Sequence, residues 1–140
     1  MDATLFNIGI CEMSADLFVQ SVKKGYDSKE FIEKLMCSDT ATYLYDKTYT
    51  QMWIGSNYII QTLEQEVTIQ RGKQYTEDLM AWIGYLFACW NLTYDEDTPK
   101  DMIRQAPVDV LTLTYQGLHV MPFEDVIKEL KNIYKENKQM

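Results

Sequence analysis

Apolar side chains recur every three or four residues along most of the chain, which is the spacing of one face of an α-helix. No stretch as long as a strand alternates apolar and polar residues with a period of two. The pattern therefore predicts an all-α protein. We expect one compact domain of about six to eight helices over residues 1–140, because no Pro-, Gly- or Ser-rich linker divides the chain.

Capping residues and glycines set the expected helix boundaries in the first half of the chain. Ser, Thr and Asp favour helix starts because their side chains accept hydrogen bonds from free backbone N–H groups, and Gly favours helix ends. The expected helices are one capped by Ser14 and stopped by Gly25, one with a capping box of Asp27 and Glu30, one started by Ser38 or Asp39, and one from Thr50 to about Gln70.

The segment from Thr76 to Trp90 is the most apolar, so we expect a helix that is buried on most sides. Three further helices follow it. They are a short helix with Thr98 and Pro99 at its start, one started by Pro107 and stopped by Gly117, and an amphipathic helix opened by Pro122.

The net charge of the chain makes some classes of binding partner less favourable than others. The chain has 21 acidic and 13 basic residues, a net charge of -8, which repels nucleic-acid phosphates and anionic lipid. No window approaches the roughly 18–20 apolar residues that a membrane span needs. We therefore expect neither direct nucleic-acid binding nor membrane insertion, and expect a protein partner with a basic surface.

The cysteines indicate a reducing compartment. Cys11, Cys37 and Cys89 are odd in number and widely spaced, and they form neither a CxxC motif nor a disulfide framework. The first residues lack a basic segment followed by a long apolar one, as a secretion signal would have. We expect a cytoplasmic protein.

The sequence has no recognisable set of catalytic residues. His119 is the only histidine, and no phosphate-binding glycine motif is present, so we expect no cofactor, no metal and no enzymatic activity. A nucleophile pair of Cys89 and His119 remains an alternative, because such groups assemble in space. The other interpretation is a structural histidine after Gly117 and a cysteine packed in the core.

Aromatic residues supply the candidate binding residues. Trp and Tyr are favoured in cores and as interface anchors, and Trp82 and Tyr85 lie off the main apolar stripe of their predicted helix. Both could therefore contact a partner or a second copy in a homodimer. The partner-binding candidates are Trp82, Tyr85, Tyr94, Tyr115 and His119.

The runs 82–86 (WIGYL) and 115–119 (YQGLH), with Trp90 between them, resemble a group of small, acidic, largely uncharacterised bacterial proteins with the patterns WIGYLYRYW and YxGxH. Residues 87–89 and Asn91 depart from that pattern and remove polar character near Trp90. Genes of this group occur near toxin–antitoxin modules. The resemblance thus implies an antitoxin or an accessory protein of such a module.

Three hypotheses follow. The leading one is a non-enzymatic acidic module that binds a protein, as an antitoxin would. The second is a phage-encoded counter-defence inhibitor that blocks the basic nucleic-acid-binding groove of its partner. The third is a small enzyme that uses Cys89 and His119.

Overall fold

The computed structural model describes residues 5–46 and 55–138. Within these ranges it contains eight α-helices and no β-strand, which confirms the all-α prediction. The helices are α1 (Leu5–Lys23), α2 (Ser28–Met36), α3 (Asp39–Leu44), α4 (Ser56–Glu66), α5 (Glu77–Thr93), α6 (Pro99–Gln105), α7 (Val108–Leu118) and α8 (Phe123–Lys138).

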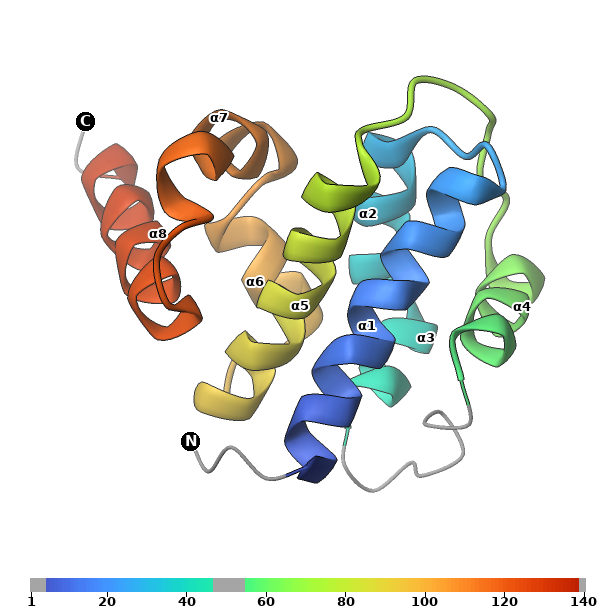
Figure 1. Cartoon of the computed structure of the whole chain (residues 1–140), viewed down its shortest axis with the longest axis horizontal. Coiled ribbons are helices and arrows are strands. Elements are labelled where there is room, and N and C mark those ends of the chain that lie inside the picture. The colour runs from blue at the N-terminus through green and yellow to red at the C-terminus, as the bar shows by residue number, and fades with distance from the viewer. Residues whose placement is uncertain (1–4, 47–54, 139–140) are drawn as a thin grey trace.

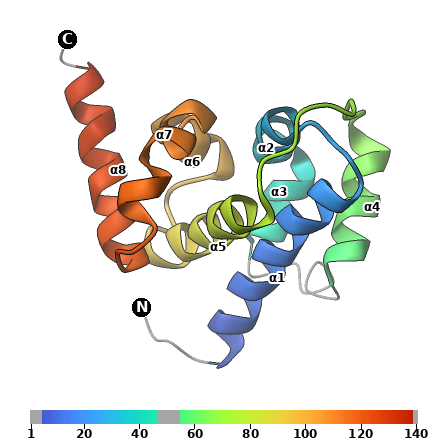
Figure 2. The ribbon, with the colours of Figure 1, turned by 45° about the horizontal axis from the view of Figure 1, so that its top comes forward.

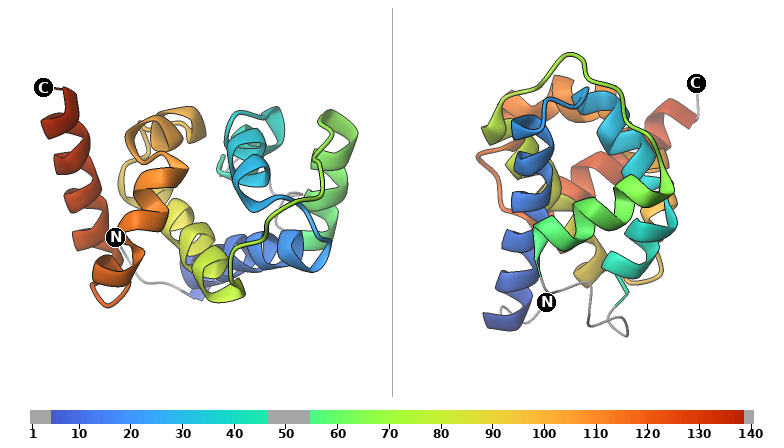
Figure 3. Two further views of the ribbon diagram at one scale, coloured as in Figure 1. Left: turned by 90° about the horizontal axis from the view of Figure 1, so that it is seen from above. Right: turned by 90° about the vertical axis from the view of Figure 1, so that its right-hand side faces the viewer.

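Helices α1 and α5 run side by side in opposite directions at the centre of the molecule (Figure 1). Seen from above, they form one layer, and α2, α3, α6 and α7 lie over it (Figure 3). Helix α4 packs beside α1, and α8 packs on α5 at the opposite end (Figure 2). The α1–α5 pair thus contacts elements from both halves of the chain.

Gly84 permits the close approach of α1 to α5. A Cβ atom at this position would lie 2.6 Å from the carbonyl oxygen of Ser14 and 2.8 Å from the ring of Phe18. Both distances are shorter than van der Waals contact, so any side chain here would push the helices apart. Gly84 is therefore a packing residue of the helix pair.

The prediction that Ser14 caps a helix is wrong. Helix α1 already includes Leu5, and Ser14 lies inside it, fully buried. Its hydroxyl donates to the carbonyl oxygen of Gly84 at 2.8 Å. A serine is tolerated within a helix when its hydroxyl has such a partner, so the residue chosen as a cap is a contact between α1 and α5.

Other predicted caps are confirmed. The side chains of Asp27, Ser38 and Thr98 each accept a hydrogen bond from a backbone N–H in the first turn of α2, α3 and α6. Thr76, which was not predicted as a cap, caps α5 in the same way. The predicted capping box of α2 is half formed, because the Glu30 carboxylate accepts from the backbone N–H of Gln70.

Helix α4 ends at Glu66, four residues before the predicted end. The next three residues, at positions 67–69, are all β-branched and favour extended backbone. The Glu66 carboxylate also accepts hydrogen bonds from the backbone N–H groups of Asp39 and Thr40 at 2.7 and 2.9 Å. The start of the predicted segment, at Thr50, lies outside the described residues.

Gly117 does not stop its helix, which corrects another predicted boundary. It lies inside α7, which continues to Leu118 and has His119 as its C-cap. The space around Gly117 is open, since a Cβ atom built there meets nothing within 4 Å.

The core lies mainly around α5, as predicted. Met80, Ile83, Leu86, Phe87 and Trp90 have no exposed surface. Burying such large side chains is the main favourable term in the stability of the fold. Among the described residues, no helix has both the length and the apolar character to cross a bilayer.

Two glycine substitutions test the packing of α1 on α5. We expect Gly84→Ala to lower the free energy of unfolding by about 1–3 kcal/mol, because the new methyl group meets the Ser14 backbone. The matched control, Gly117→Ala, should raise it by roughly 0.5 kcal/mol, because alanine favours a helix and nothing obstructs it. Urea unfolding followed by circular dichroism measures both. Equal stability of Gly84→Ala and the wild type would contradict the close approach.

Candidate functional site

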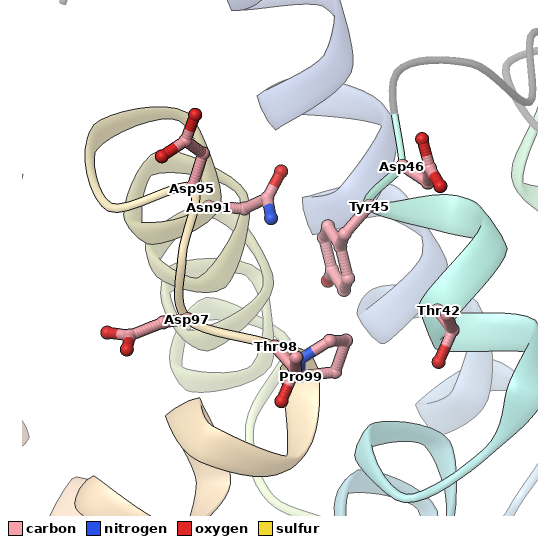
Figure 4. Close-up of a pocket in the computed structure, with 8 residues that line it drawn as sticks. All are labelled: Thr42, Tyr45, Asp46, Asn91, Asp95, Asp97, Thr98 and Pro99. Carbon is pink, nitrogen blue, oxygen red and sulfur yellow. The ribbon is translucent and has the colours of Figure 1, made fainter.

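A pocket of about 350 Å³ lies where the C-terminal ends of α3 and α5 meet the start of α6 (Figure 4). Segments far apart in the sequence form its walls. The lining residues are Thr42, Tyr45, Asp46, Asn91, Asp95, Asp97, Thr98 and Pro99.

The lining is acidic. Three of these residues carry carboxylates, and none is Lys, Arg or His. The C-terminal ends of α3 and α5 add partial negative charge from their last carbonyl groups, and neither helix has a basic residue in its last turn. This combination attracts a cation and repels an anion.

The start of α6 contributes charge of the opposite sign, but its own residues offset much of it. The Asp101 carboxylate accepts a hydrogen bond from the backbone N–H of Thr98 at 3.0 Å and completes a capping box. The bonds from Thr98 and the nearby Arg104 hold the pKa of Asp101 below its ordinary value. The cap is therefore ionised at neutral pH.

Tyr45 is a fixed wall of the pocket. Its hydroxyl lies 2.9 Å from Ser14 Oγ, which donates its single proton to Gly84. The Tyr45 hydroxyl must therefore donate to Ser14. Burial raises the pKa of Tyr45, which keeps the phenol protonated for this bond. The core of the protein thus holds the pocket wall in position.

Asp97 points away from the other pocket residues (Figure 4). Its carboxylate accepts from Lys131 Nζ and from Trp90 Nε1, each at 2.8 Å. Burial alone would raise the pKa of Asp97, but the bonds from Lys131 and Trp90 outweigh it, and the pKa falls below its ordinary value. This carboxylate ties α8 to the loop before α6.

Asp46 and Asp95 carry the acidic character of the open side. They lie on opposite sides of Asn91 and Tyr45 (Figure 4). Within the described ranges, no three His, Cys, Asp or Glu side chains are placed to hold a metal ion. Carboxylates can bind an organic cation, such as a guanidinium or ammonium group, through charge-assisted hydrogen bonds.

Three of the predicted partner-binding residues, Trp82, Tyr115 and His119, contact one another through their rings. Trp82 is only 8% exposed and contacts Tyr115 edge to face, with ring centroids 5.2 Å apart. Tyr115 in turn stacks on the exposed ring of His119 at 4.7 Å. Trp82 Nε1 is the one buried side-chain nitrogen or oxygen of the described chain that lacks a hydrogen-bond partner.

The other two candidates lie elsewhere. Tyr85 is half-buried and stacks on Phe123 at 4.8 Å, so it joins α5 to α8. Tyr94 lies under Lys131 Nζ, 4.5 Å from the ring centroid, in a cation–π contact. None of the five predicted residues lines the acidic pocket.

Sequence reasoning did not single out the pocket residues from α3 and α5. Asp95 and Asp97 stand in an acidic run of the sequence between two predicted helices. One signal could have found the site: the helices that the structure ends at Leu44 and Thr93 both lack basic residues in their last turns. Their meeting in space depends on the tertiary fold.

Cys89 and His119 make their contacts with different groups. Cys89 Sγ lies 3.6 Å from Cys11 Sγ, in the core between α5 and α1. His119 Nδ1 lies 2.8 Å from the carbonyl oxygen of Tyr115 and 3.1 Å from that of Gln116. The histidine thus binds the free carbonyl groups at the end of α7.

Two apolar side chains, one in the middle of α7 and one just after its end, are well exposed. Leu113 is 82% exposed and Val120 is 76% exposed. Val120 lies two residues after the last residue of α7 and seven residues after Leu113. We call Leu113 and Val120 the α7 apolar patch.

Comparison of the chain with protein-family models, curated proteins and solved structures gives no match. Function therefore has to be inferred from the geometry of this chain.

The Asp97–Lys131 pair gives a prediction for stability. Asp97→Asn should lower the free energy of unfolding at pH 7 by about 1 kcal/mol, because it removes a charge-assisted hydrogen bond. A carboxyl with a lowered pKa stabilises the fold above its unfolded-state pKa, near 3.8, and loses this effect as pH falls through its folded-state pKa. The difference in free energy of unfolding between the wild type and Asp97→Asn should therefore disappear at acid pH. Glu129→Gln, at an exposed position on α8, is the control. A difference in free energy of unfolding that does not change with pH would contradict a stabilising Asp97–Lys131 ion pair.

Proposed function

We propose that this protein is a non-enzymatic acidic module that binds a basic protein partner, and that the acidic pocket receives a Lys or Arg side chain of that partner. One observation carries the proposal. The pocket lies at the C-terminal ends of two helices without basic last turns, with Asp46 and Asp95 on either side.

The other lining groups fit the same occupant. The Asn91 side-chain carbonyl and the Thr42 hydroxyl can accept hydrogen bonds, and a guanidinium or ammonium group has only donors to offer. The Tyr45 ring adds an aromatic surface on which a guanidinium group could stack. A volume of about 350 Å³ is at the small end for ligand pockets and suits one long side chain.

The biological role that we propose is an antitoxin or an accessory protein of a toxin–antitoxin module, acting in the cytoplasm. The net charge of -8 supports it, because it would accelerate encounter with a basic protein. The sequence resemblance supports it independently.

The second candidate is an inhibitor that occupies the nucleic-acid-binding groove of its partner. It would use the same acidic groups, and its binding would be almost entirely electrostatic. The α7 apolar patch favours the first candidate, since it offers a contact that salt does not weaken. The patch could also contact a second copy of this chain. An enzyme that uses Cys89 and His119 is not favoured by the separate contacts of these residues.

The pocket can be tested by removing its charge. We expect the double variant Asp46→Asn, Asp95→Asn to lose most of its binding to a basic protein that the wild type retains from lysate of the native cells. The physical reason is the loss of both carboxylates that flank the pocket. Quantitative mass spectrometry of the retained proteins, at low salt, is the measurement.

The control has the same change in net charge at a different place. Glu129→Gln with Glu136→Gln removes two carboxylates from exposed positions of α8 and should retain the partner. If the two double variants lose binding equally, the binding depends on net charge and not on the pocket, which would contradict the proposed role of the pocket. Enrichment of acidic proteins, or of none, would overturn the proposal.

The α7 apolar patch separates the two candidates. We expect part of the binding to survive a high-salt wash, and Leu113→Glu to abolish that part, because it puts a charge into an apolar contact. Gln116→Glu, at an exposed position of the same helix, adds the same charge as a control. Complete loss of wild-type binding at high salt would instead favour the groove inhibitor.

Sedimentation of the purified chain shows whether the patch binds a second copy.

A further inference from the structure

Two thiols lie against each other in the core. Cys11 on α1 and Cys89 on α5 are 78 residues apart in sequence, yet their Sγ atoms are 3.6 Å apart. They are 2% and 4% exposed. The two helices run antiparallel and side by side (Figure 1), and Gly84 brings their backbones close one to two turns away. The partners of a disulfide need this proximity.

The two thiols differ in their ionisation. The hydrogen bond between the two thiols lowers the pKa of Cys11 and outweighs burial and the nearby Glu12. The same bond, with burial, raises the pKa of Cys89. Cys11 is therefore the more nucleophilic sulfur, with Cys89 beside it as the second thiol.

We propose that Cys11 and Cys89 form a peroxide-reactive dithiol that closes into an intramolecular disulfide between α1 and α5. The proposal rests on their separation, their burial and their position on two packed helices. It does not depend on the proposed function. The oxidant is a hydroperoxide, of which hydrogen peroxide is the smallest and best able to enter the core.

The reaction has two steps. The Cys11 thiolate attacks one peroxide oxygen, the O–O bond breaks, and hydroxide leaves and takes up a proton as Cys11 becomes a sulfenic acid. The Cys89 sulfur then attacks Cys11 Sγ, the S–S bond forms, the S–O bond breaks, and water leaves with the Cys89 proton. Overall, two thiols and one hydrogen peroxide give one disulfide and two water molecules.

The disulfide would stabilise the fold. It closes a loop that runs from α1 through α2, α3 and α4 to α5, so it removes much of the conformational freedom of the unfolded chain. For a chain of this size we expect the midpoint of thermal unfolding to rise by roughly 10 °C. Oxidation would thus fasten the central helix pair.

Cys37 provides the background for the test, because it is exposed and lies at the end of α2. The Cys37→Ser protein, treated with hydrogen peroxide and then alkylated, should carry no alkyl group, and protease digestion should give one peptide pair joined through Cys11 and Cys89. Its thermal midpoint should rise, and dithiothreitol should reverse the change. Chains linked to each other, or thiols oxidised only to sulfinic acid, would overturn the proposal.

Single replacements test the order of the steps. In the Cys37→Ser background, Cys89→Ser should let a dimedone-type reagent trap the sulfenic acid on Cys11, and Cys11→Ser should give little trapping on Cys89. Neither variant should show the rise in thermal midpoint. Equal trapping on both would contradict the assignment of Cys11 as the attacking thiol. The peptide map of the Cys37→Ser protein, which keeps both Cys11 and Cys89, tests whether the disulfide forms even if a single replacement disturbs folding.

Discussion

A short chain of hydrogen bonds from Tyr45 through Ser14 to the carbonyl oxygen of Gly84 joins α3, α1 and α5 at one point. It works in one direction, because Ser14 has a single proton and gives it to Gly84, so a protonated Tyr45 must donate. The absence of a side chain at Gly84 is what lets the helices come this close. The pocket wall at Tyr45 is held by these bonds, and the thiol pair lies on the same two helices, α1 and α5.

The sequence predicted the fold class well because the core is regular. The apolar positions of α2, α5 and α8 repeat with the helical period, and most of them are buried as expected. Prediction failed at Ser14 and Gly117, whose residue types favour helix boundaries only when no other interaction acts. Ser14 has a buried partner on a distant helix, and Gly117 adopts ordinary helical backbone in open space. Neither fact can be read from neighbouring residues.

The candidate site was harder to predict because its residues belong to two separate segments, 42–46 and 91–99. Asp95 and Asp97 stand in an acidic run of the sequence, but only the fold shows that the end of α3 lies opposite that run. The aromatic residues predicted to bind a partner are strongly patterned, and the structure places Trp82 and Tyr85 in contacts between helices. The sequence pattern thus identified the large side chains correctly but did not predict which residues they contact.

The carboxylates of the pocket divide between stability and recognition. Asp97 is compensated within the protein by Lys131, which links α8 to the loop before α6. Asp46 and Asp95 lie beside the C-terminal ends of α3 and α5, whose last carbonyl groups carry partial negative charge. Under the proposed function, a cation would find this arrangement of charge only in the folded state. Binding of the proposed basic partner at this site would therefore also stabilise the fold.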